Sequence, residues 1–175
     1  WINLLTDSGP ALALGIDPLD PAVMRRRPRS RQDRLIDRDM IVSIGIIGLT
    51  MAVATLAMLD AKLAGGLIEG SSDLDTARTA AFTVLVLAQL FNAFNTRSDH
   101  RSAFRLMTSN PWLLATIAFS LALQILVVHW SVLNEAFSTA PLSREDWLWS
   151  AILASSVLWV GELRKLMART RTVSS

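Results

Sequence analysis

Apolar segments of nearly membrane-spanning length alternate with charged segments along this chain of 175 residues. A helix rises about 1.5 Å per residue and needs about 20 mostly apolar residues to cross a hydrocarbon core about 30 Å thick. Four segments have an uncharged, apolar core close to this length. The pattern therefore predicts four transmembrane helices, at residues 40–59, 79–95, 111–134 and 147–163.

Residues 1–16 form a fifth apolar run, which carries a single charge at Asp7. As a helix this run would reach only about 24 Å, so we interpret it as the end of a span that begins before residue 1. Five buried helices of a soluble protein are the alternative, but five apolar runs separated by charged loops fit it poorly. The expected fold is an all-α membrane protein, a multi-span transmembrane helical bundle of one partial and four full spans.

Basic residues are concentrated in alternate loops. Of the 17 Lys and Arg residues, 14 lie in residues 17–39, in the loop after residue 95 or in the tail after residue 163. Cytoplasmic loops of multi-span proteins carry the excess of Lys and Arg. We therefore expect residues 17–39 to be a cytoplasmic loop and the C-terminus of this integral, multi-pass membrane protein to be cytoplasmic.

Composition and charge exclude several other classes of protein. Apolar residues make up 51% of the chain, charged residues 18%, and the mean hydropathy is +0.39, which excludes a disordered chain. The absence of Cys excludes disulfides and thiolate metal sites. The Arg-rich stretch in residues 25–34 follows two prolines, contains another, and has no aromatic residue for base stacking. We therefore expect contact with membrane lipids, including anionic ones, and no nucleic acid.

The first apolar run contains the strongest candidate for an ion site. Asn3, Thr6 and Asp7 are spaced i, i+3 and i+4, so a helix places them on one side. Carboxylate, amide and hydroxyl oxygens suit a hard cation such as Ca²⁺. Pro10 lacks the N–H that would bond the carbonyl of Thr6, so we expect a bend or unwinding there. Alternatively, Asp7 is hydrated near a helix end while its two neighbours bond other helices.

Other polar residues of the apolar runs are weaker candidates. Gln89 and Asn92 form an i, i+3 pair that could complete an ion site, although a neutral amide pair more often bonds neighbouring helices. Gln124 is single and is interpreted as structural. His100 and His129 have no partner at metal-ligand spacing. No phosphate-binding loop or catalytic triad is present, so we expect no catalytic residue in this chain.

Several motifs are similar to the type II P-type ATPases, specifically to the calcium-pump branch. Residues 1–18, WINLLTDSGPALALGIDP, resemble the sixth membrane helix of that family. The segment that follows, DPLDPAVMRRRPR, resembles the family's cytoplasmic loop after the sixth helix. LFNAFN at residues 90–95 resembles the end of the eighth helix, and ELRK at residues 162–165 the end of the tenth.

The resemblance implies that residues 1–175 are the C-terminal transmembrane domain of an ATP-driven cation pump. Its sixth helix supplies ion ligands, which fall here on Asn3, Thr6 and Asp7, and Asn3 favours the calcium branch. The ligand position of the eighth helix falls on Gln89, where two-ion pumps carry Glu, so this ligand is expected to be weak. Ca²⁺ is the expected transported ion and Mn²⁺ the alternative.

The resemblance also implies partners and cofactors outside this chain. The remaining helices and the cytoplasmic domains of the same pump are the expected partners, and those domains bind ATP and Mg²⁺. The loop at residues 17–39 is expected to contact the phosphorylation domain and to couple it to the helices. The alternative function is a small multi-pass membrane protein with a structural or partner-binding role, in which Asp7 only pairs with another helix.

Overall fold

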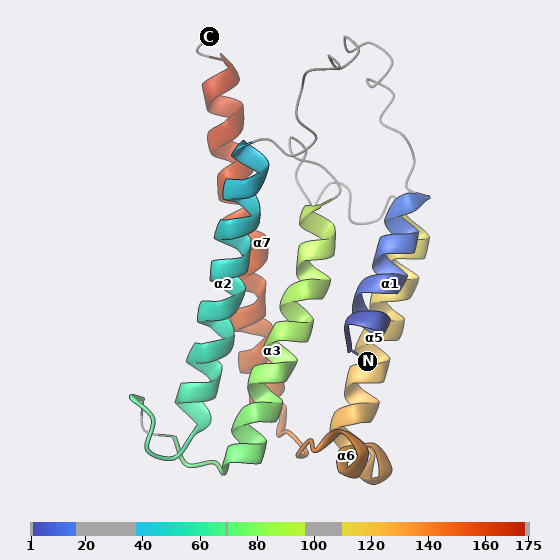
Figure 1. Ribbon diagram of the computed structural model, residues 1–175, viewed down its shortest axis with the longest axis vertical. Coiled ribbons are helices and arrows are strands. Elements are labelled where there is room, and N and C mark those ends of the chain that lie inside the picture. Colours follow the sequence, from blue (N-terminus) through green and yellow to red (C-terminus); the bar gives the residue numbers. More distant parts are fainter. Residues whose placement is uncertain (1, 17–37, 69, 97–109, 174–175) are drawn as a thin grey trace.

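The computed structural model describes residues 2–16, 38–68, 70–96 and 110–173. Within these ranges every regular element is a helix, and the only strand-like feature is an isolated bridge between Leu63 and Ser72. The all-α prediction is therefore confirmed. The helices, labelled in Figure 1, are α1 (Ile2–Gly15), α2 (Arg38–Lys62), α3 (Leu74–Asn95), α5 (Pro111–His129), α6 (Ser131–Phe137) and α7 (Arg144–Val173).

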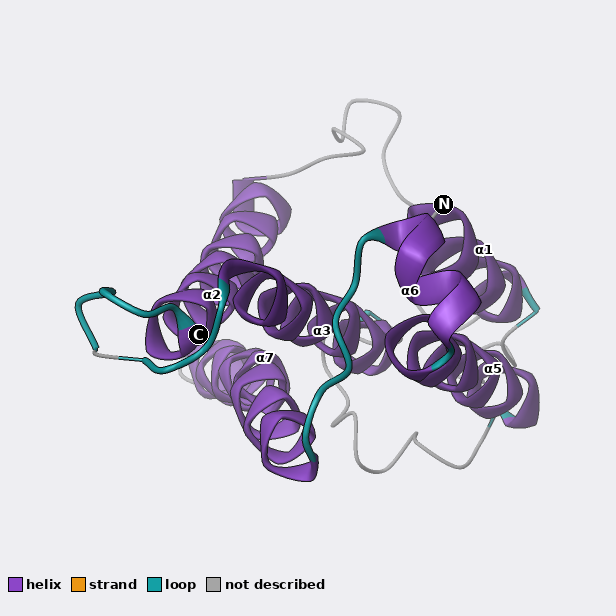
Figure 2. Ribbon diagram, turned by 90° about the horizontal axis from the view of Figure 1, so that it is seen from below, coloured by secondary structure: helices purple, strands orange, loops and turns teal. Residues whose placement is uncertain are grey.

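The predicted transmembrane segments 40–59, 79–95 and 147–163 lie within α2, α3 and α7, and the first 19 residues of the predicted segment 111–134 form α5. Three helical stretches of the described chain are long and apolar enough to cross a membrane: Met40–Lys62, Leu74–Asn95 and Pro111–His129. The long helices run side by side as a bundle, and the short α6 lies at the end of α5 (Figures 1 and 2).

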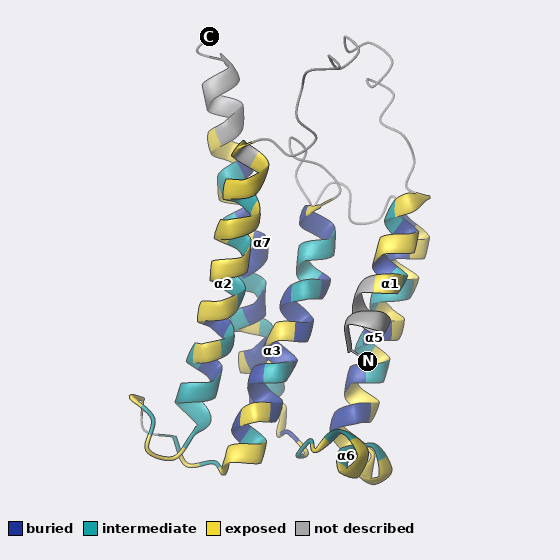
Figure 3. Cartoon of the chain, viewed as in Figure 1, coloured by how far each residue is buried: buried dark blue, intermediate teal, exposed yellow. Residues whose placement is uncertain are grey.

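Helix α3 is the centre of the bundle. It contacts α1, α2, α5 and α7, and most of its residues are buried. Figure 3 shows the contrast with α2, whose outward face is exposed along its length. That face carries large exposed apolar side chains, among them Ile41, Ile44 and Leu49.

Small and β-branched side chains let the central helices pack closely. One buried cluster of six side chains joins α2, α3, α5 and the segment before α7, and Trp147 and Leu153 of α7 pack against it. Alanine and valine dominate it, as expected for helices whose backbones approach one another within a membrane. The buried members of this cluster are Ala54, Met58, Ala80, Val84, Val128 and Leu142.

The predicted helix at residues 111–134 is wrong at its end, because α5 stops at His129. Trp130 has extended backbone angles, φ −92° and ψ 117°, and α6 begins after it. Side chains replace the backbone hydrogen bonds that a longer helix would make. Asn134 Nδ2 donates to the carbonyl of Val128 at 2.9 Å, and Thr139 Oγ1 donates to the carbonyl of Val127 at 2.7 Å. Two terminal carbonyls of α5 are thus bonded without further helix.

Of the bend or unwinding expected at Pro10, the unwinding does not occur. Helix α1 is continuous from Ile2 to Gly15 with Pro10 inside it. A proline removes one ladder hydrogen bond, and here Pro10 is buried against the rest of the bundle, so packing holds the helix across the gap.

Candidate functional site

The three predicted ion ligands lie in the first two turns of α1. Asn3, Thr6 and Asp7 are all within Ile2–Gly15, so the helical spacing on which the prediction rests is present in the backbone. Their side chains lie outside the described part of the structure. That they converge on an ion therefore stays a prediction, and the geometry that can be given is that of the surroundings of α1.

Asn110 fastens the end of α1 to the beginning of α5. Its Nδ2 donates to the carbonyl of Ala13 at 2.9 Å, and its Oδ1 accepts from the amide of Leu113 at 3.1 Å. The same buried side chain thereby caps the N-terminus of α5 and bonds a C-terminal carbonyl of α1. The position of the candidate helix along its neighbour is fixed by these two bonds.

Helix α1 approaches α5 closely at Gly9. A Cβ added to Gly9 would lie 3.3 Å from the Cβ of Thr116, tighter than an ordinary van der Waals contact. An alanine here would require the Thr116 side chain to shift by a few tenths of an ångström. The small residue therefore sets the distance between α1 and α5.

The C-terminal half of α1 packs against α3. A buried apolar cluster contains Ala13 of α1, Phe94 of α3, Leu113 of α5 and Leu158 of α7. Gln89 is half-buried on α3, the same neighbour, about five residues before Phe94. Its role as a weak fourth ligand stays a prediction.

Gln124 and Thr83 form a buried hydrogen bond between α5 and α3. Gln124 Nε2 donates to Thr83 Oγ1 at 3.0 Å, and that hydroxyl donates to the carbonyl of Thr79 at 2.8 Å. The interpretation of Gln124 as a structural residue agrees with this contact. Thr83 was not singled out by the sequence, because a threonine in an apolar run gives no sign of whether its hydroxyl has a partner.

A second polar contact, between α3 and α7, was likewise not predicted. Asn95 Nδ2 donates to the carbonyl of Val157 at 2.9 Å, and both residues are buried. Gly161 lies one turn further along α7, where an added Cβ would be 2.5 Å from Asn95 Nδ2. The glycine leaves the space that the asparagine side chain occupies.

Lys62 and Asp146 join the end of α2 to the start of α7 by an ion pair. Asp146 is only 5% exposed, and its Oδ2 also accepts from the amide of Ser143 at 2.9 Å and from the Ser143 hydroxyl at 2.7 Å. Ser143 Oγ accepts in turn from the amide of Asp146, which completes a capping box. Burial raises the pKa of Asp146, but the Lys62 ammonium and the Ser143 donors outweigh it and hold that pKa below its usual value.

His129 contacts Trp147 at the same end of the bundle. Trp147 Nε1 donates to His129 Nε2 at 3.0 Å, and the two rings are stacked with centroids 6.2 Å apart. Among the described residues no group of three or more His, Cys, Asp or Glu side chains could hold a metal ion. His129 thus links the end of α5 to the start of α7 as a hydrogen-bond acceptor.

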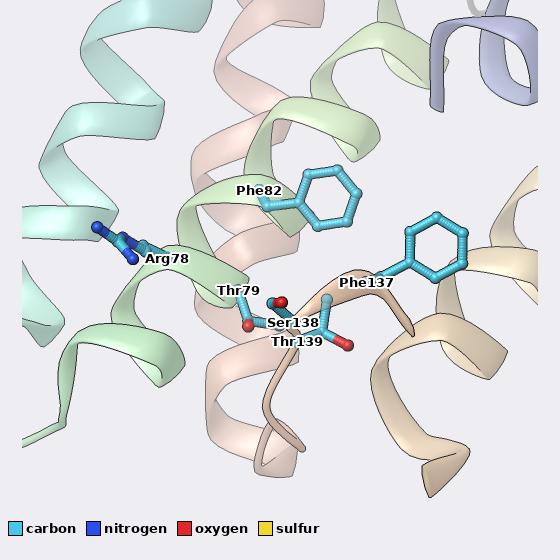
Figure 4. Close-up of a pocket in the computed structure, with 6 residues that line it drawn as sticks. All are labelled: Arg78, Thr79, Phe82, Phe137, Ser138 and Thr139. Carbon is cyan, nitrogen blue, oxygen red and sulfur yellow. The ribbon is translucent and has the colours of Figure 1, made fainter. Parts of the chain in front are cut away.

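A cavity of about 180 Å³ lies between α3 and the segment after α6. Figure 4 shows its lining: two phenylalanine rings, the hydroxyl groups of the Ser and Thr residues, and an arginine that extends away from the rings. No carboxylate lines it, so it does not suit a divalent cation. The lining residues are Arg78, Thr79, Phe82, Phe137, Ser138 and Thr139.

Comparison with known proteins identifies relatives along almost the whole chain. It is 33% identical over 172 residues to calcium-transporting ATPase type 2C member 1 of Homo sapiens, a match that covers 98% of this chain and 18% of the relative. It is 31% identical to calcium-transporting ATPase 1 of Yarrowia lipolytica, over 100% of this chain and 18% of the relative. Calcium-transporting ATPase 1 of Bacillus cereus is 33% identical, over 95% of this chain and 20% of the relative.

The chain thus spans about a fifth of the length of these relatives. The sequence profile of the family described as "Cation transporting ATPase, C-terminus" matches residues 1–167. Together with the three apolar helices, this makes the protein an integral membrane protein. The chain belongs to the C-terminal domain family of the cation-transporting ATPases.

Proposed function

We propose that this chain is the C-terminal membrane part of an ATP-driven pump that transports Ca²⁺. The observation that carries the proposal is the family match over residues 1–167, which includes all of α1. Relatives whose names state calcium transport match along nearly the full chain, which favours Ca²⁺ over Mn²⁺. A small structural membrane protein has no comparable support.

In this proposal α1 binds the transported ion. Asp7 supplies the negative charge, while Asn3 and Thr6 supply neutral oxygen ligands. A carboxylate within a membrane span is costly without a partner, and the cation is that partner. Asn110 and Gly9 support the site indirectly, because they fix the axial position of α1 and its distance from α5.

The remaining parts of the pump would supply the energy. ATP and Mg²⁺ bind in cytoplasmic domains outside this chain, and residues 17–39 transmit the conformational change from those domains to the helices. The proposed orientation therefore has residues 17–39 and the C-terminus on the cytoplasmic side. Membrane lipids are the other partner, and the exposed apolar face of α2 supports contact with them.

The test is Asp7→Asn in the intact pump. Asparagine keeps the shape of the side chain and removes its charge, so the variant should lose phosphorylation from ATP that depends on Ca²⁺. Phosphorylation from inorganic phosphate, which in this family needs the ion-free state, should survive. Asn3→Ala and Thr6→Ala should weaken Ca²⁺ affinity less, because water replaces part of a neutral ligand.

Asp75→Asn is the matched control, since Asp75 is exposed in the first turn of α3. This variant should retain both phosphorylation reactions. Unchanged Ca²⁺ affinity in Asp7→Asn would refute the ligand assignment. A wild-type protein that ATP does not phosphorylate in the presence of any divalent cation would refute the pump itself.

A further inference from the structure

The connection between α2 and α3 is a loop held together by its own hydrogen bonds. The amide of Ser72 donates to the carbonyl of Lys62 at 3.0 Å, and the amide of Ala64 donates to that of Ser72 at 3.2 Å. These bonds close the loop at its base. The segment inside them is short, so its tip has a defined position relative to the end of α2.

Asp60 fixes the tip of this loop. One oxygen of its carboxylate accepts from the amide of Leu67 at 2.8 Å, and the other accepts from the amide of Ile68 at 2.9 Å. Gly66 passes so close to Asp60 that an added Cβ would lie 2.5 Å from the Asp60 carbonyl oxygen. Gly65, with φ +86°, makes the turn that brings the chain to this position.

The two residues whose amides are held in this way expose large apolar side chains. Leu67 is 99% exposed and Ile68 is 61% exposed. A loop in water would gain nothing from presenting two adjacent aliphatic side chains on a fixed backbone. Their display therefore indicates a surface that covers them.

The position of the loop indicates which surface this is. In Figures 1 and 2 it extends from the end of α2 away from α3 and the other helices, and in Figure 1 its outer part lies beside the last turns of α2. The outward side chains of α2 are apolar and exposed along the helix, as lipid-facing residues are. The tip thus lies next to the exposed apolar surface of α2, just beyond the end of the candidate span Met40–Lys62.

We propose that Leu67 and Ile68 form a membrane anchor that inserts into the acyl-chain boundary of the leaflet at this end of α2. Asp60 is the positioning residue: it bonds the two backbone amides, which would otherwise require water, and so lets the side chains enter the apolar layer. The anchor fixes the depth of the α2–α3 connection in the bilayer. It depends only on the protein spanning a membrane and not on which ion is transported.

Nitroxide labels measure this depth directly. The chain contains no Cys, so single substitutions Leu67→Cys and Ile68→Cys would be introduced into the intact protein after its other accessible cysteines are replaced. The labelled protein would be placed in phosphatidylcholine nanodiscs that contain no other protein. Leu56→Cys, on the exposed face of α2, serves as the lipid control, and Ser71→Cys, exposed in the same loop, as the water control.

Labels at 67 and 68 should be accessible to oxygen and protected from a water-soluble nickel reagent, as at 56, whereas the label at 71 should be open to nickel. Nickel access at 67 and 68 equal to that at 71 would overturn the proposal. Protection from both reagents would also overturn it, because it would mean that another protein segment covers the tip.

Asp60→Ala tests the positioning role with the same label. Without the carboxylate, the nitroxide at 67 should become more mobile and its oxygen-to-nickel accessibility ratio should fall toward that at 71. Asp73→Ala is the matched control, because Asp73 is an exposed carboxylate of the same connection, whereas the two tip amides donate to Asp60. An unchanged ratio and mobility in Asp60→Ala would remove Asp60 from the proposal.

Discussion

Asn95 of α3 and Gly161 of α7 occupy one shared space, in which the amide of the first fills the position that a side chain of the second would take. The contact lies where the central helix meets the last helix of the chain. Because both residues are buried, the structure has little room to relax around a change at either one.

Gly161→Ala should therefore destabilise the protein by about 1–3 kcal/mol, since the new methyl group displaces the Asn95 amide and breaks its bond to Val157. The thermal unfolding midpoint in detergent, followed by tryptophan fluorescence, measures this effect. In an Asn95→Ala background the same substitution should cost much less. Equal costs in the two backgrounds would show that the two residues do not compete for space.

The Gln124–Thr83 bond should contribute modestly to stability. Gln124→Leu and Thr83→Val should each lower the free energy of unfolding by about 0.5–2 kcal/mol, the range found for hydrogen bonds between membrane helices. The double variant should lose less than the sum, because both substitutions remove the same bond. Thr50→Val is the control, since the Thr50 hydroxyl bonds only the carbonyl of Ile46 in its own helix.

Acid should weaken the junction of α2 and α7. The pKa of Asp146 is lower in the folded protein than in the unfolded chain, so its contribution is complete above the usual aspartate pKa of about 4. The contribution is lost as pH falls through the folded-state pKa. Asp146→Asn should lower the unfolding midpoint at pH 7, and this difference from wild type should shrink toward pH 3.

Glu145→Gln is the control for that measurement, because Glu145 is exposed in the same first turn of α7. Its midpoint should follow the wild-type curve throughout. If the difference between Asp146→Asn and wild type were independent of pH, the carboxylate charge would have no part in the junction.

Gln89 bears on how many ions each cycle carries. Glutamine supplies an oxygen but no charge, and two divalent ions in a low-dielectric site need more negative charge than one. We predict one divalent ion per cycle. Binding of radioactive calcium to the intact pump should give one ion per phosphorylation site without cooperativity, and Gln89→Ala should change affinity only several-fold. Two ions with a Hill coefficient clearly above one would contradict this.

The orientation is testable because the chain offers serines in every loop. Ser30→Cys and Ser98→Cys in the intact pump should react with an impermeant maleimide only from the cytoplasmic side, and Ser72→Cys and Ser138→Cys only from the other side. Labelling of position 30 from the non-cytoplasmic side would reverse the orientation. Labelling of 30 and 72 from one side would overturn the number of spans between them.

The sequence predicted which segments are helical, because long uncharged runs in a membrane protein leave the backbone no other means of satisfying its hydrogen bonds. It did not predict the break at Trp130. That break depends on the bonds that Asn134 and Thr139 make to the last carbonyls of α5, and side chains with such partners look the same in a sequence as those without.

Part of the candidate site could likewise be predicted from the sequence, and part could not. The spacing of Asn3, Thr6 and Asp7 was readable because a helix has a fixed period, and the described backbone of α1 preserves it. The contacts that hold α1 in place could not be predicted from the sequence, because Asn110 is 97 residues from its partner Ala13. Proximity between segments so far apart comes from tertiary packing rather than from local pattern.

The central place of α3 has a consequence for how the protein is made. A chain is synthesised from its N-terminus, so α3 enters the bilayer before α7, its most extensive neighbour, exists. Until then the amide of Asn95 lacks the carbonyl of Val157, and the close contact at Gly161 has no counterpart. Helix α7, which is synthesised after α3, therefore completes the middle of the bundle, and a chain that ended before Arg144 would leave the central helix without that neighbour.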